Sequence, residues 1–74
     1  VLYMPLSMAA TNNEVTVMDF RGNSSVTRRL NELGLVKGTR IKVIQGSRNG
    51  SMLIKVLNSK LVINLSTAHG VIVA

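Results

Sequence analysis

The sequence predicts a small, mainly β fold: a partly open barrel of about five strands with one inserted helix. The chain has 74 residues, roughly half of a typical domain, so residues 1–74 are expected to form a single unit. Apolar residues make up 46% of it and aromatic residues only 3%, so branched aliphatic side chains must build the core. Many of these residues lie in short alternating runs bounded by glycine and asparagine, a pattern typical of strands joined by turns.

The first strand is predicted over residues 14–20. Polar and apolar residues alternate there, which places Val15 and Val17 on one buried face. Before it, residues 5–9 are expected to form a short helical turn, because proline suits the first position of such a turn. Residues 21–23 break the strand.

The one helix is predicted over residues 25–33. Val26, Leu30 and Leu33 have i, i+4, i+7 spacing and form a single apolar stripe that is expected to face the core. The charged residues between them fall away from this stripe.

Both ends of this helix carry sequence signals. Ser24 or Ser25 is expected to cap its start by accepting a backbone N–H. Gly34 stands where a left-handed residue ends a helix, and Leu35 is placed to contact Leu30 in a Schellman ending.

Four further strands are expected after the helix. Lys37 and Gly38 suit the central positions of a type II turn, because the third residue of that turn needs a positive φ. Alternation then places Ile41 and Val43 on one face. The strands are predicted at residues 40–45, 52–57, 60–65 and 71–73.

Short connections join these strands. Residues 46–50 are predicted to form a five-residue loop that ends in a hairpin-prone Asn-Gly pair, and Asn58 and Ser59 a two-residue turn. Residues 66–70 form a short helical turn or loop. A sheet of short strands with two-sided apolar runs buries most surface when it closes or nearly closes, so we predict an SH3-like barrel. The alternative is an OB-type barrel, which usually needs longer strands and more residues.

The charge of the chain is unbalanced. Nine lysine and arginine residues against three acidic residues give a formal net charge of +6. This predicts an acidic partner or a solvated basic surface. The apolar runs are far shorter than the roughly 20 residues that span a bilayer, and residues 1–10 lack the features of a signal peptide. A cytoplasmic location without membrane insertion is therefore expected.

Catalysis and metal binding are not predicted. His69 is the one histidine, the only carboxylate side chains are Glu14, Asp19 and Glu32, and cysteine is absent. No serine lies in a G-x-S-x-G turn, and the sequence has no G-x-x-x-x-G-K-[ST] phosphate loop. A metal site needs imidazole and carboxylate ligands brought together. We expect no catalytic residue, no metal ligand and no cofactor.

A family resemblance rests on residues 28–39, which read RRLNELGLVKGT. This segment resembles the R-R-L-x-E-L-G-[LM]-x-x-G-[TS] pattern of the FeoA family, the small ferrous iron transport protein A. The resemblance extends over residues 4–74. The sequence departs from the family pattern at Asn58, where glycine is common, and at Asn64, where arginine often stands.

The resemblance implies an SH3-like fold and a cytoplasmic accessory role in ferrous iron uptake. The implied partner is FeoB, the membrane transporter whose cytoplasmic part carries a G-domain, and the implied role is binding and regulation rather than chemistry. The same barrel also occurs as the C-terminal domain of DtxR-type metal-dependent repressors. A stand-alone relative of that domain is therefore an alternative.

The expected partner-binding residues lie on the helix and the turn that follows it. An apolar cleft between the helix end and the strand over residues 40–45, with a basic rim, would suit an acidic amphipathic segment; alternatively, Leu35 merely completes the helix cap. Self-association or strand addition at a sheet edge is a further mode. The predicted contact residues are Arg28, Arg29, Glu32, Leu33, Leu35, Lys37 and Arg40.

Nucleic acid is the alternative partner that the positive charge raises. Small barrels that bind single strands rely on stacking aromatic side chains, and only Phe20 and Tyr3 are available. We therefore expect no nucleic-acid binding. The basic residues that such a function would use are Arg21, Arg28, Arg29, Lys37, Arg40 and Lys42.

Overall fold

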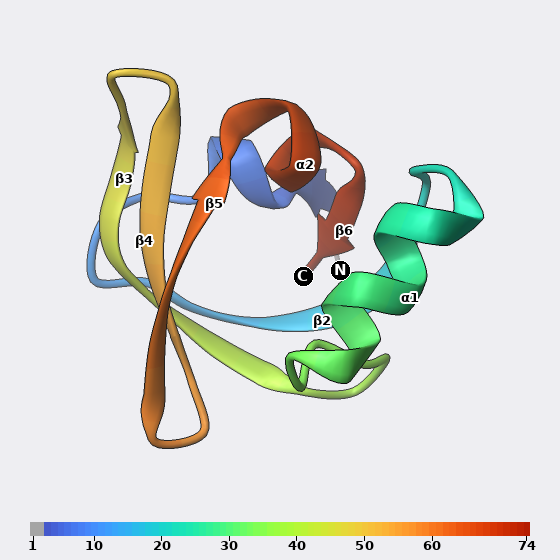
Figure 1. The fold of residues 1–74 in the computed structure, drawn as a ribbon. Coiled ribbons are helices and arrows are strands. Elements are labelled where there is room, and N and C mark those ends of the chain that lie inside the picture. Colours follow the sequence, from blue (N-terminus) through green and yellow to red (C-terminus); the bar gives the residue numbers. More distant parts are fainter. Residues whose placement is uncertain (1–2) are drawn as a thin grey trace.

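Six antiparallel strands form one sheet that curls into a partly open barrel, in the order β1-β6-β2-β3-β4-β5 (Figure 1). This computed structural model describes residues 3–74, and for residues 47 and 48 the backbone only; the first two residues of the predicted unit lie outside it. The strands are β1 (Met4–Pro5), β2 (Glu14–Phe20), β3 (Arg40–Arg48), β4 (Ser51–Val56), β5 (Ser59–Asn64) and β6 (Val71–Val73).

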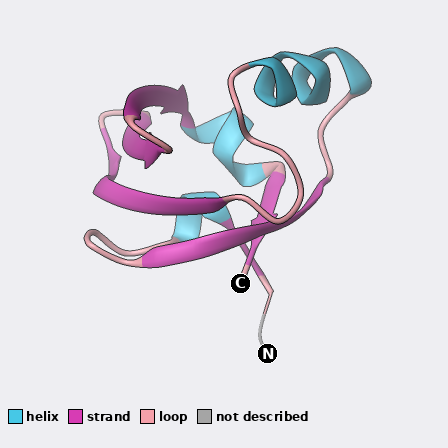
Figure 2. Cartoon of the chain, turned by 90° about the horizontal axis from the view of Figure 1, so that it is seen from below, coloured by secondary structure: helices cyan, strands magenta, loops and turns pink. Residues whose placement is uncertain are grey.

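Three short helical segments complete the fold. They are η1 (Leu6–Met8), a 3-10 turn, α1 (Ser24–Glu32) and α2 (Leu65–His69). Figure 2 shows α1 at one corner of the molecule, joined to the barrel by a loop at each end. The predicted mainly β fold with one inserted main helix is confirmed. The sixth strand, β1, is only two residues long, which is why alternation alone did not reveal it.

Branched aliphatic side chains fill the barrel. Val15 and Val17 of β2 and Ile41 and Val43 of β3 point inward, as the alternation predicts. Among the described residues, no polar or charged side chain is buried. The largest fully buried side chains are Leu6, Leu35, Ile41, Ile54, Val17, Val43, Val56, Val71 and Val73.

The start of α1 differs from the prediction. The cap is Asn23, whose Oδ1 accepts a hydrogen bond from the Val26 N–H at 2.9 Å, and neither Ser24 nor Ser25 serves in this way. Asn23 has the extended backbone that a capping residue needs, whereas both serines already lie within the helix.

The end of α1 follows the predicted Schellman motif. Gly34 has a φ of +101°, its N–H donates to the Asn31 carbonyl at 3.1 Å, and the Leu35 N–H donates to the Leu30 carbonyl at 2.9 Å. Leu30 is buried, but Leu33 is 48% exposed, so the predicted core stripe does not reach the helix end.

The turns of the β3–β4 and β4–β5 hairpins differ from the prediction: the first is shorter, and the second is shifted by one residue. Strand β3 continues to residue 48, and the β3–β4 turn consists of Asn49 and Gly50 alone, with φ values of +55° and +82°. Two positive φ values are typical of a type I′ turn, whose twist matches the flanking strands and makes the predicted five-residue loop unnecessary. In the β4–β5 hairpin Val56 pairs with Ser59, so the turn starts one residue earlier than predicted, at Leu57.

Candidate functional site

The predicted contact residues divide into an exposed set and one core residue. Leu35 has no exposed surface, because the Schellman ending of α1 directs its side chain into the barrel. The prediction that Leu35 lines a partner-binding cleft is therefore wrong, and Leu35 is a core residue that completes the helix cap. The charged contact residues are all exposed: Arg28, Arg29, Glu32, Lys37 and Arg40.

The turn after α1 is held firmly against β2. The Gly38 N–H donates to the Val17 carbonyl at 2.8 Å, and the Val17 N–H donates to the Thr39 carbonyl at 2.9 Å. The Thr39 N–H closes the type II turn on the Val36 carbonyl at 3.0 Å, and Gly38 has a φ of +92°, as predicted. These bonds fix the backbone that leads into Arg40.

Lys37 is paired within the chain. Its Nζ lies 3.5 Å from Oδ1 of Asp19, and both side chains are more than half exposed. The Phe20 N–H, which donates to the same Oδ1 at 2.8 Å, and then the Lys37 charge hold the pKa of Asp19 below its ordinary value. Water screens a pair this exposed, so it contributes little to stability but partly neutralises Lys37.

Leu57 is a functional candidate that sequence reasoning missed. It is 77% exposed and has a φ of +56°, a left-handed conformation that is rare and strained for leucine. A strained, solvent-exposed leucine contributes little to the turn or the core, so Leu57 is a candidate contact residue. No sequence signal marked this position, because a residue with a positive φ is usually a glycine and residue 57 is a leucine.

Leu57 lies beside the end of α1. A Cβ atom added to Gly34 would lie 3.7 Å from Val56 Cγ1 and 3.9 Å from Leu57 Cδ1, so the β4–β5 turn reaches the helix end. Exposed apolar side chains from two separate segments, Leu33 and Leu57, therefore flank Gly34.

A shallow hollow with a basic wall adjoins Leu57. We call it the basic hollow. Arg40 and Lys42 enter it from β3 and Lys55 from β4, where Lys42 and Lys55 are direct cross-strand partners. The alternation of β3 placed Arg40 and Lys42 outward, but only the strand register joins Lys55 to them. The residues that line the basic hollow are Glu14, Thr39, Arg40, Lys42, Lys55 and Leu57.

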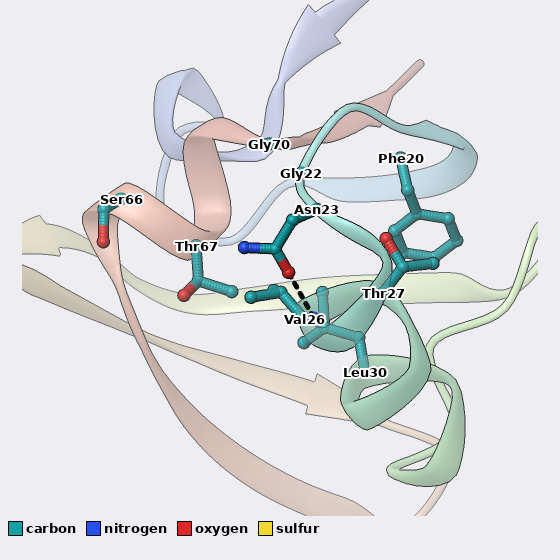
Figure 3. A pocket seen from close by; sticks show the side chains of 9 residues that line it. All are labelled: Phe20, Gly22, Asn23, Val26, Thr27, Leu30, Ser66, Thr67 and Gly70. Atoms are coloured by element: carbon teal, nitrogen blue, oxygen red, sulfur yellow. Dashed lines mark hydrogen bonds between the residues drawn. The ribbon is translucent and has the colours of Figure 1, made fainter.

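A second hollow, of about 190 Å³, lies between α1 and α2. Figure 3 shows Val26 and Leu30 on the α1 side and Ser66 and Thr67 on the α2 side. None of its lining residues is charged, and the Asn23 Oδ1 is already occupied by the helix cap. The hollow can hold a small side chain but offers no group for acid–base chemistry. It is lined by Phe20, Gly22, Asn23, Val26, Thr27, Leu30, Ser66, Thr67 and Gly70.

The remaining titratable groups form no reactive cluster in the part of the chain that the structure describes. His69 is exposed, and its Nδ1 lies 3.5 Å from the Ser7 hydroxyl. Residues 3–74 contain no group of three histidine, cysteine or acidic side chains placed to hold a metal ion. Phe20 is half-buried in the hollow beside α1, so it is poorly placed for base stacking. No helix among the described residues is long and apolar enough to cross a membrane.

Comparison with known proteins identifies related chains. The family model described as the FeoA domain matches residues 4–74. No curated protein matches the chain significantly.

Solved structures share the fold over nearly the whole chain. A crystal structure of an iron uptake regulatory protein (FeoA) has a TM-score of 0.89 at 24% identity, covering 100% of this chain and 97% of that one. The FeoA protein of Chlorobium tepidum has a TM-score of 0.83 at 27% identity, covering 95% and 68%. A manganese-dependent transcriptional repressor has a TM-score of 0.87 at 14% identity, covering 96% and 40%. The likeness to the repressor confirms the predicted SH3-like barrel.

Proposed function

The chain belongs to the FeoA domain family, and on that premise we propose that it is a non-enzymatic accessory module of ferrous iron uptake. It docks on the cytoplasmic part of a FeoB-type membrane transporter and alters the nucleotide cycle or the assembly of that transporter. Its place of action is the cytoplasm, and the role needs no cofactor of its own.

The observation that carries this proposal is Leu57. An exposed leucine in a left-handed conformation weakens the free fold, and a contact made only in a complex would account for it. Leucine beside the arginine and two lysines of the basic hollow suits an acidic partner segment with an apolar anchor. This docking site keeps Leu33 and Arg40 of the predicted set and replaces Leu35 by Leu57.

Calorimetric titration of the domain with the cytoplasmic part of a FeoB-type transporter tests the proposal. Leu57→Asn is expected to weaken binding, because it removes the apolar anchor while suiting the turn. Leu57→Met, which keeps an apolar side chain of similar volume, is the matched control and is expected to bind much like the parent. Equal binding by the parent and Leu57→Asn contradicts the proposed site, and no binding by the parent contradicts the proposed partner.

The fold of the repressor supports a second candidate, a stand-alone relative of its SH3-like domain. In that role the domain would engage segments of a separate repressor chain. Titration with such a repressor in place of the transporter separates the two candidates, because only the cognate partner should be sensitive to Leu57→Asn.

A further inference from the structure

Three lysines stand in one row across the outer face of the barrel. Lys42 on β3 is the cross-strand partner of Lys55 on β4, and Lys55 is the partner of Lys60 on β5. All three side chains are exposed. We call them the lysine row. Like charges directly opposite each other on neighbouring strands destabilise a sheet, so the fold itself gains nothing from this arrangement.

The protection of a sheet edge explains only one member of the lysine row. A lysine on an edge strand discourages unwanted strand pairing, and β5 is an edge strand of this sheet. Lys42 and Lys55 lie on β3 and β4, which are paired on both sides. At the far end of the row Glu14 faces Lys42, and in the described part of the chain no acid lies beyond Lys60. The row is therefore open to a negative charge at the β5 edge.

The backbone of β5 is free to pair at that same place. In a two-residue hairpin the pair that flanks the turn exchanges both hydrogen bonds, so Val56 and Ser59 start an alternating series. The Leu65 N–H, which donates to the Gly50 carbonyl at 3.0 Å, keeps this alternation. The backbone N–H and C=O groups of Lys60 and Val62 consequently point away from β4, toward the open edge.

An apolar row runs beside the lysine row. Leu53 on β4 is the partner of Val62 on β5, and Val62 is 71% exposed. Both side chains line a shallow hollow on the outer face. A strand added next to β5 would place one side chain opposite Lys60 and, two residues along, another opposite Val62.

We propose that the free edge of β5 accepts an extended segment of a partner protein, with an acidic residue opposite Lys60 and an apolar residue opposite Val62. The inference rests on the proposed function for the identity of the partner and adds the chemistry of its segment. Charge complementarity favours this occupant over a second copy of the chain, because a second copy brings the same lysine row and a net charge of +6.

The test is amide hydrogen exchange and chemical-shift titration with a blocked peptide, acetyl-TETVTET-amide. Exchange at Lys60 and Val62 is expected to slow several-fold, with little change at α1. The matched peptide acetyl-TKTVTKT-amide, in which lysine replaces glutamate, is expected not to bind. Protection by both peptides alike, or shifts at Lys42 and Lys55 without protection of the edge, overturns the proposal.

Two variants locate the effect on β5. Lys60→Glu reverses the charge at the edge, and Arg21→Glu makes the same change in net charge at an exposed residue outside the predicted contact set. Only Lys60→Glu is expected to abolish peptide binding. Val62→Pro removes an N–H that does not bond to β4, a change that edge strands tolerate. It blocks strand addition at the edge and is therefore also expected to weaken peptide binding. Unchanged peptide binding by Lys60→Glu overturns the proposal even where Val62→Pro fails to fold. Edge protection that rises with protein concentration in the absence of peptide also overturns it, in favour of self-pairing.

The cytoplasmic part of the transporter, used as a second titrant, separates this inference from the proposed function. Transporter binding that is sensitive to Leu57→Asn but leaves Lys60 and Val62 unprotected overturns the edge proposal alone. Peptide binding at the edge without any transporter binding supports the edge proposal and overturns the proposed partner.

Discussion

Replacing Leu57 by asparagine should make the free protein more stable. Leucine at a φ of +56° is held in the left-handed region, which costs an L-residue roughly 1–2 kcal/mol. Asparagine adopts this region several-fold more readily than most residues, so Leu57→Asn relieves much of that cost.

The packing lost in this variant is small. Leu57 is 77% exposed, and full burial of a leucine side chain contributes only about 1.5–3 kcal/mol, so the quarter that is covered contributes roughly 0.5 kcal/mol. The balance is a gain of about 0.5–1.5 kcal/mol in the free energy of unfolding. For a domain of this size, about 1 kcal/mol raises Tm by roughly 4–8 °C.

Thermal and urea unfolding followed by circular dichroism measure this gain. Leu57→Ala is the matched control, because it loses the same contact but lacks the short polar side chain that lets asparagine adopt the left-handed region. It is therefore expected to fall slightly below the parent. A Leu57→Asn variant no more stable than Leu57→Ala refutes the argument that the strain lies in the backbone.

Three further predictions concern the elements that position the site. Gly34→Ala places a Cβ at a φ of +101° and should destabilise by about 1–2 kcal/mol in urea unfolding, whereas Gly22→Ala, where a Cβ meets only Val26 at 3.9 Å, should cost less; equal losses contradict the assigned helix ending. Asn23→Ala should cost about 1 kcal/mol through the lost cap and Asn23→Ser much less, so equal unfolding midpoints for the two variants would show that Asn23 is not the cap. Asp19→Asn should lower stability slightly at about pH 7, and the difference should vanish at about pH 2, because the lowered pKa makes the ionised carboxylate stabilising only above it; a difference that persists in acid contradicts this origin.

Local patterns in the sequence predicted the frame of the fold well. Alternation placed Val15 and Val17 of β2 on the buried face, and a glycine at the right spacing identified the Schellman ending at Gly34. The N-terminal cap was misplaced because Asn23, Ser24 and Ser25 can all cap a helix, and only the backbone path shows which one has the extended conformation.

The candidate site was harder to predict because tertiary structure determines it. The sequence left two roles open for Leu35, a contact in a cleft or completion of the helix cap, and the chain reversal at Gly34 places it in the core. Leu57 carried no turn signal, because leucine is rarely found at a positive φ. The lysine row joins residues from three strands, and only the register of the sheet shows that Lys42, Lys55 and Lys60 face one another.

The most direct test of the accessory role is a chemical-shift titration of the labelled domain at physiological salt. One titrant is the cytoplasmic part of a FeoB-type transporter, and the other is a short mixed-sequence oligonucleotide. We predict localised shifts around Leu57 and Arg40 with the transporter and none with the oligonucleotide. Salt-sensitive shifts over the basic side chains with the oligonucleotide alone would contradict the account and identify the domain as a nucleic-acid-binding module.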